Sequence, residues 1–168
     1  MDNNDLLIRL RYALDIKNND MVEIFKLGGI ELTKEEVLKV LTKSPESDDE
    51  ADGIWEAPEN EGHIKADNAM FESFLNGLIV FKRGRQEGQP ATPPLTNEPS
   101  KNLLLKKVKI ALQLTSEDML EILQLAGVTV TKSEMSAMLR KQGHKNYSVT
   151  GDRYARNFLK GLAIKYRK

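Results

Sequence analysis

Cysteine is absent from the 168 residues, and histidine and tryptophan are scarce, with two His and one Trp. Without cysteine the chain can form neither disulfides nor thiolate metal sites. No apolar run approaches the roughly 20 residues that a membrane-spanning helix needs. The acidic N-terminal stretch MDNNDLLIRL also lacks the apolar segment of a signal peptide. These absences favour a cytoplasmic protein that does not enter a membrane.

Recognisable catalytic motifs are also missing. The sequence shows no nucleophile-elbow serine, no glycine-rich phosphate loop and no HExxH zinc motif. A site made of carboxylates alone stays open as an alternative, but most carboxylates stand at helix starts or in one acidic segment, where capping or solvation explains them. We therefore expect a protein that is not an enzyme and that uses no cofactor.

What the sequence does contain is a duplication. The stretch DMVEIFKLGGIELTKEEVLKVL, residues 20–41, returns as DMLEILQLAGVTVTKSEMSAML, residues 118–139. Residues 4–41 and 102–139 align without a gap and share 15 identities in 38 columns. We therefore expect a first repeat at 1–83 with an acidic insertion at 44–67, a Pro-rich linker at 84–100, and a second repeat at 101–168.

Apolar residues recur at helical spacing in four segments of each repeat. This pattern predicts an all-α protein made of two tandem homologous modules of about four helices each. The first helix of each module is expected to begin at an N-cap asparagine, Asn4 or Asn102. The second helix is apolar around most of its circumference, which predicts that it is the central buried helix. Gly29 and Gly127 are expected to end this helix in the left-handed conformation.

The third helix has the clearest start signal. Thr33 with Glu36, and Thr131 with Glu134, are predicted capping boxes, and the helices are expected to run to about residues 43 and 141. The fourth helix contains Phe-Leu-Xaa-Gly-Leu in both repeats. A glycine within a helix costs roughly 1 kcal/mol relative to alanine, so another backbone is expected to cross closely there. We predict that the two modules pack face to face through these glycines, Gly77 and Gly161.

The net charge of zero hides an asymmetry between the two halves of the chain. Residues 1–89 hold 19 acidic and 11 basic side chains, whereas residues 90–168 hold 6 acidic and 14 basic ones. Either the halves attract each other, or each meets a different partner.

Several of these motifs resemble a known bacterial family. They are the doubled Asp-Met-Xaa-Glu-Ile, FLNGLIVFKRG at 74–84, HKNY at 144–147 and the second Phe-Leu-Xaa-Gly-Leu. Together they are similar to the YehS-like proteins, which are built from a duplicated domain of unknown function, and the similarity covers essentially the whole chain. The resemblance implies a helical duplicated fold and a bacterial cytoplasmic setting, but no activity. The insertion at 44–67 looks longer and more acidic than the connector that is usual in this family.

The acidic insertion offers the best metal candidate. Residues 48–59 place acids at positions one, three, five, nine and twelve of an EF-hand-like loop, with glycine at position six. Glutamate at position three and Pro58 at position eleven argue against calcium, so a solvated acidic loop is the preferred interpretation and no metal site is predicted. Trp55 lies in the same segment. It is interpreted as an anchor to its own module, or alternatively as an aromatic that contacts a partner.

The second repeat combines positive charge with tyrosines. Candidate binding residues are Arg140, Lys141, His144, Lys145, Tyr147, Arg153, Arg156, Lys160 and, in the insertion, Trp55. Positive charge beside stacking rings suits single-stranded nucleic acid, although charge runs on helices are commonly solvated faces. His144 is expected to be a turn residue. We expect a non-enzymatic binding or adaptor protein with an unknown protein partner, and nucleic-acid binding by the second repeat is the alternative.

Overall fold

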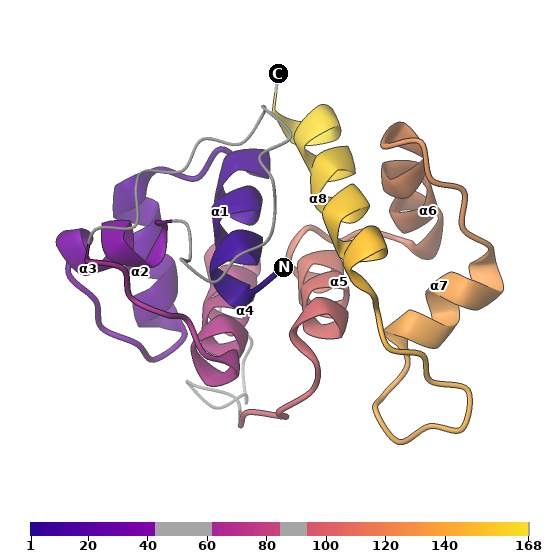
Figure 1. The fold of residues 1–168 in the computed structure, drawn as a ribbon, viewed down its shortest axis with the longest axis horizontal. Helices are drawn as coiled ribbons and strands as arrows, with labels where there is room; N and C mark the ends of the chain where they lie inside the picture. Colours follow the sequence, from indigo (N-terminus) through magenta and orange to yellow (C-terminus); the bar gives the residue numbers. More distant parts are fainter. Residues whose placement is uncertain (43–61, 85–93, 168) are drawn as a thin grey trace.

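A computed structural model describes residues 1–42, 62–84 and 94–167, and these residues form eight α-helices and no strand (Figure 1). The first repeat contributes α1 (Asn3–Ala13), α2 (Asn18–Leu27), α3 (Lys34–Val40) and α4 (Asn68–Arg83). The second contributes α5 (Ser100–Ala111), α6 (Ser116–Leu125), α7 (Lys132–Leu139) and α8 (Asp152–Tyr166). The predicted all-α fold with four helices in each repeat is therefore confirmed. Within the described ranges no helix is both long and apolar enough to cross a membrane.

The helices of the two repeats are arranged in the same way. In each repeat the second helix packs against the fourth and the third helix packs against the second, so that α2–α4 and α2–α3 correspond to α6–α8 and α6–α7. The repeats join through α4 against α5 and α1 against α8. Consequently α1, α4, α5 and α8 occupy the centre, while α2 and α3 flank them on one side and α6 and α7 on the other (Figure 1).

Helix starts and stops largely follow the local sequence. Thr33 and Thr131 each accept a hydrogen bond from the backbone N–H three residues on, at 3.1 Å, and complete the predicted capping boxes. Gly29 and Gly127 have φ of 95° and 84°, which only glycine adopts without strain. In the first repeat the Ile30 N–H then donates to the Phe25 carbonyl at 2.9 Å, as a Schellman turn requires.

The predicted caps of the first helices are wrong. α1 is capped by Asp2, which forms a capping box with Asp5, and the N-cap residue of α5 is Pro99. Asn4 is instead fully buried: its Nδ2 donates to the carbonyls of Val40 (2.7 Å) and Ile64 (2.9 Å), and its Oδ1 accepts the Ala66 N–H (3.0 Å). The asparagine therefore ties α1 to the end of α3 and to the segment that leads into α4.

Asn102 makes the same three bonds in the second repeat. Its Nδ2 donates to the carbonyls of Met138 (3.0 Å) and Ser148 (2.9 Å), and its Oδ1 accepts the Thr150 N–H (2.9 Å). Buried backbone groups outside regular structure need such partners. The asparagine thus compensates for the irregular connection between the third and fourth helices in both repeats.

The prediction that the second helix is the central buried one is also wrong. Within α2 the buried residues are Met21, Ile24 and Phe25, and Leu125 of α6 is 42% exposed. Most of α1 and a continuous run of α4 are buried instead. The reason is tertiary: α1 and α4 are covered by the other repeat as well as by their own, whereas α2 lies at the flank.

The fourth-helix glycines do allow close packing, but not between the repeats. A Cβ on Gly77 would overlap the carbonyl oxygen of Ile24 in α2, and a Cβ on Gly161 would overlap that of Ile122 in α6. In the first repeat Gly28 allows a second close approach, because a Cβ there would overlap the Ser73 carbonyl oxygen of α4. The prediction that the modules meet through these glycines is therefore wrong, because each glycine faces its own repeat.

Polar contacts at the ends of the chain reinforce the junction between the repeats. The N-terminal amino group lies 3.2 Å from Asp152 of α8. Near the C-terminus, Arg167 lies 3.2 Å from Asp15 and stacks over the Tyr12 ring, with 3.9 Å from its guanidinium carbon to the ring centroid. These exposed pairs add to a continuous apolar core that spans both repeats.

The described part of the linker is attached to α4 by a buried carboxylate. Glu72 is 1% exposed, and it accepts hydrogen bonds from the N–H and hydroxyl of Thr96 and from the N–H of Asn97, at 2.8 to 3.2 Å. Three donors replace the water that a buried carboxylate loses. The linker residues just before α5 are therefore held against the first repeat.

Candidate functional site

Positive charge in the described part of the chain is concentrated in the second repeat. Residues 1–42 and 62–84 contain ten acidic and nine basic side chains, whereas residues 94–167 contain six acidic and thirteen basic ones. The acidic surplus of the first half stands in residues 43–61, with eight acids and one lysine, which lie outside the described residues. The described part of the first repeat is thus nearly neutral. Among the described residues, only the second repeat has a large excess of charge of one sign.

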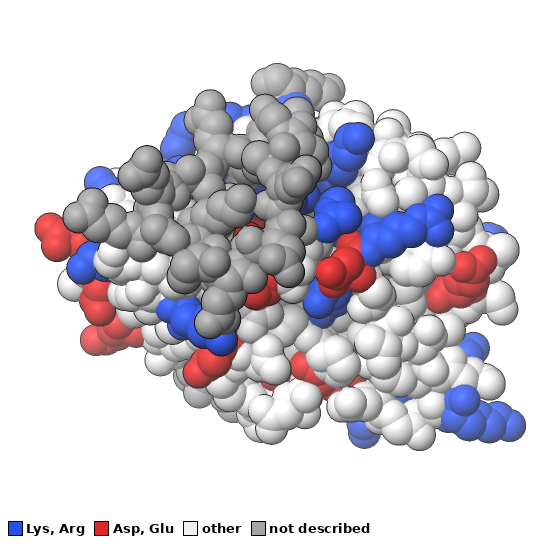
Figure 2. Space-filling view, viewed as in Figure 1, with Lys and Arg blue, Asp and Glu red and all other residues white. Residues whose placement is uncertain are grey.

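Three of the predicted binding residues share one face of α8. Arg153, Arg156 and Lys160 follow one another at spacings of three and four residues, which places them on one side of a helix. Arg153 and Lys160 are exposed and Arg156 is half-buried. Figure 2 shows Lys and Arg side chains gathered over α8. Ile164, one turn beyond Lys160, is 48% exposed.

Carboxylates limit the strength of this surface at its edges. The Tyr154 hydroxyl donates to Glu134 at 3.1 Å. The pKa of Glu134 is lowered by the Thr131 hydroxyl, then by the Tyr154 hydroxyl and the Thr131 amide, with a smaller contribution from the charge of Arg153. At the other end Lys165 lies 4.0 Å from Glu121. The positive surface of α8 is therefore short, because a carboxylate lies close to each of its ends, Glu134 at one and Glu121 at the other.

Residues 140–151, which join α7 to α8, carry the next group of predicted residues. Lys141, His144 and Lys145 are exposed. His144 Nδ1 accepts the N–H of Asn146 at 3.1 Å, and the His144 N–H donates to the Lys141 carbonyl at 3.0 Å. The prediction that His144 is a turn residue is thus confirmed.

The tyrosines of the second repeat are mostly engaged. Tyr147 is half-buried with the Lys106 ammonium 5.7 Å from its ring centroid, and burial, followed by the negative charge of Glu98, raises the pKa of its hydroxyl. Tyr154 is half-buried, whereas Tyr166 is 39% exposed. Tyr166 is thus the most exposed of these three tyrosines, with the Lys165 ammonium 6.0 Å from its ring centroid.

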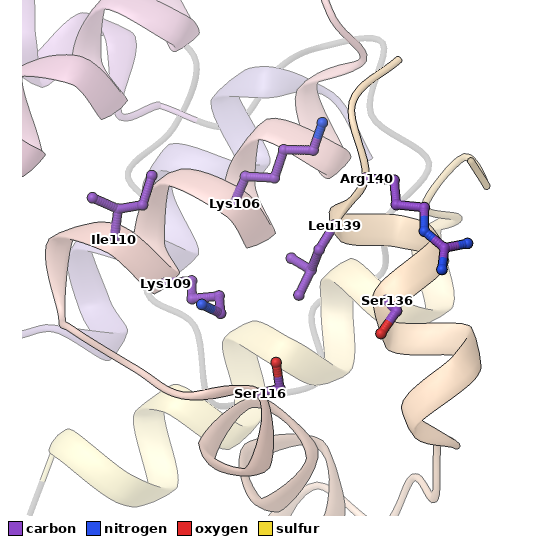
Figure 3. Close-up of a pocket in the computed structure, with 7 residues that line it drawn as sticks. All are labelled: Lys106, Lys109, Ile110, Ser116, Ser136, Leu139 and Arg140. Atoms are coloured by element: carbon purple, nitrogen blue, oxygen red, sulfur yellow. The ribbon is translucent and has the colours of Figure 1, made fainter. Parts of the chain in front are cut away.

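Sequence reasoning missed a pocket between α5, α6 and α7. It has a volume of about 530 Å³ and is lined by Lys106, Lys109, Ile110, Ser116, Ser136, Leu139 and Arg140. Figure 3 shows Lys109, Ser116 and Ser136 directed toward the space between the helices, with Lys106 and Arg140 at its rim. Of the predicted binding residues Arg140 lies here. The pairing of α5 with α7 creates the pocket, and no local pattern reports that pairing.

The linker reaches the rim of this pocket. Glu98 lies 2.6 Å from the Lys106 ammonium and also accepts the Gln142 N–H at 3.3 Å. Burial raises the pKa of Glu98, but the bond and charge of Lys106 and the bond from Gln142 outweigh it, and the net pKa is lowered. The charge of Lys106 is therefore already compensated.

In the described ranges no three His, Cys, Asp or Glu side chains gather closely enough to hold a metal ion. The EF-hand-like stretch at 48–59 and Trp55 lie outside those ranges.

Comparison with known proteins identifies the family. A family described as "Protein of unknown function (DUF1456)" matches residues 3–84 and 101–168, which are the two repeats. The chain belongs to the DUF1456 family. A similar member is the "Uncharacterized protein YehS" of Escherichia coli (strain K12), which is 38% identical over 165 residues, 98% of this chain and 96% of that protein. The resemblance to YehS-like proteins is thereby confirmed. No solved structure matches the chain.

Proposed function

We propose that this DUF1456 protein is a non-enzymatic binding or adaptor module whose second repeat docks on an acidic surface of a protein partner. The observation that carries the proposal is the charge of the described second repeat, thirteen basic against six acidic side chains, on helices whose counterparts in the first repeat are nearly neutral. Since both repeats have the same fold, the fold itself does not require this excess. Such an excess steers oppositely charged partners.

A protein partner suits the α8 face better than a nucleic acid does. The face combines Arg153, Arg156 and Lys160 with the exposed Ile164, and protein interfaces mix arginine with apolar contacts. A single-stranded nucleic acid would use open aromatic faces, and two of the three tyrosines here are half-buried.

Nucleic-acid binding by the second repeat is the alternative function, favoured by the exposed Lys141 and Lys145 beside α8. Its affinity would fall steeply with salt, because each phosphate contact releases counterions. We also propose that the protein acts in the cytoplasm of a bacterium; the Escherichia coli source of its relative supports the bacterial part of this proposal.

The test compares two triple variants with equal changes in charge. Arg153→Glu, Arg156→Glu and Lys160→Glu together reverse the α8 face. The control reverses Lys17, Lys34 and Lys82, which are exposed cations of the first repeat. Each tagged protein, shown to be folded by circular dichroism, captures partners from a bacterial extract with and without nuclease.

We expect the wild type and the control to capture one or more proteins that the α8 variant does not capture. These proteins should still be captured after nuclease treatment. Loss of every captured protein with nuclease, together with a salt-sensitive shift of RNA or DNA, would establish the alternative. Equal loss in both variants would mean that net charge, and not the α8 face, governs binding.

A further inference from the structure

We infer that the pocket between α5, α6 and α7 is a binding site for a phosphorylated small molecule. The site goes beyond the adaptor function, and its residues are distinct from Arg153, Arg156 and Lys160 of the α8 face. Its volume of about 530 Å³ lies within the range of small-molecule sites, roughly 300 to 1,000 Å³. That space is much larger than a phosphate ion, so it leaves room for an organic part of the ligand beside the phosphate.

The charge of the pocket comes from side chains of two helices. Lys109 lies on the pocket face of α5, and Arg140 follows the last turn of α7. Within the part of the chain that the structure describes, neither makes an ion pair, and Arg140 donates only one weak bond, to the Asn146 carbonyl at 3.3 Å. None of the lining residues is acidic. Lys109 and Arg140 are thus available to an anion, whereas Lys106 at the rim is paired with Glu98.

Hydroxyl groups indicate which anion the pocket suits. Ser116 and Ser136 are exposed and point into the space from α6 and α7, with Lys109 on the α5 side (Figure 3). Lysine, arginine and hydroxyl donors together match the several acceptor oxygens of a phosphate group. The amino end of α6 is not needed for the argument, because Thr115 and Asp118 already cap it.

Two apolar side chains also line the pocket. Ile110 is 43% exposed, and Leu139 lines the same pocket. Figure 3 shows the Leu139 side chain directed between α5 and α7. A site of this kind holds an organic group against an aliphatic side chain and the phosphate against the cations, as in small-molecule sites that combine an apolar lining with a few placed polar groups.

The first repeat shows that the scaffold does not need these cations. The aligned positions of Lys106, Leu139 and Ser136 hold Ile8, Leu41 and Leu38, and of these Ile8 and Leu41 are 7% and 5% exposed.

The cation that aligns with Lys109 is also used differently. Its counterpart, Arg11, donates through Nη2 to Asn18 Oδ1 at 2.8 Å, and Thr42 stands where the second repeat has Arg140. The first repeat thus has apolar residues and one hydrogen-bonded cation at these positions, whereas the second repeat places Lys109 and Arg140 there without an acidic partner among the lining residues.

The test uses the full chain and isothermal titration calorimetry. The titrants are inorganic phosphate, nucleoside 5′-monophosphates, sugar phosphates and glycerol phosphate, each organic phosphate paired with its unphosphorylated form. The test variant is Lys109→Gln with Arg140→Gln. The matched control is Lys141→Gln with Lys145→Gln, which removes the same charge from exposed residues outside the pocket.

We expect at least one organic phosphate to bind at least tenfold more tightly than both inorganic phosphate and its unphosphorylated form. Loss of two charge-assisted hydrogen bonds should weaken that binding by at least tenfold in the test variant and by less than about twofold in the control. Amide resonances of Ser116 and Ser136 should shift on titration. The inference is overturned if no organic phosphate binds at millimolar concentration, or if both variants bind equally well.

Discussion

Replacing Asn102 by alanine should destabilise the protein by about 2 to 4 kcal/mol. The substitution removes three buried hydrogen bonds, to the carbonyls of Met138 and Ser148 and the N–H of Thr150. A hydrogen bond contributes roughly 1 kcal/mol net, so three bonds contribute about 3 kcal/mol, and a buried group left without a partner raises its share to as much as about 3 kcal/mol unless water reaches it. Part of the loss is recovered if the 140–151 segment loosens. Domains of this size are stable by about 5 to 15 kcal/mol, so the change is a large fraction of the total.

The assay is urea unfolding followed by circular dichroism. Asn4→Ala should give a similar loss, because Asn4 makes the same three bonds in the first repeat. Asn102→Asp should be worse than Asn102→Ala at neutral pH, because it sets a carboxylate oxygen against two carbonyl oxygens. Asn146→Ala, at an exposed position, serves as the control and should stay within about 0.5 kcal/mol. Our reasoning is refuted if Asn102→Ala leaves the free energy of unfolding unchanged, or if the aspartate variant is as stable as the wild type.

Three further predictions concern packing, pH and the linker. Gly161→Ala should lower the free energy of unfolding by about 1 to 3 kcal/mol, because the new methyl group overlaps the Ile122 carbonyl. An unchanged urea midpoint would contradict this prediction. The folded-state pKa values of Glu36 and Glu134 are lowered by their capping threonines, so their stabilising contribution is present above the unfolded pKa of about 4.3 and is lost as pH falls through the folded values. Glu36→Gln with Glu134→Gln should therefore flatten the fall in urea midpoint between pH 6 and 3, and an unaltered slope would argue against it. Glu72→Ala removes the acceptor of the linker amides, so hydrogen exchange at residues 96–97 should accelerate while exchange in α6 stays the same.

The α8 face and the pocket were unequally visible in the sequence. The spacing of Arg153, Arg156 and Lys160 within one predicted helix was enough to put them on one face, because helical periodicity is a local property. Arg140 was predicted as a binding residue, but its proximity to Lys109 and Ser116 was not. The three residues come together only when α5, α6 and α7 pack against one another. Along the chain, Lys109 and Ser116 are 31 and 24 residues away from Arg140.

The sequence by itself determined the duplication, the all-helical fold, the glycine turns at Gly29 and Gly127, and the threonine capping boxes. The duplication is a property of the residue string and the helices follow from its periodicity, whereas the turns and caps depend on neighbours within about five residues, where the backbone conformation and a single side chain decide the outcome. Only the tertiary structure decided that α1 and α4, and not α2, are the most buried helices of the first repeat, and that Asn4 holds a connection together. Burial and hydrogen-bond partners depend on what lies across the interface, and in this protein the second repeat covers the centre of the first.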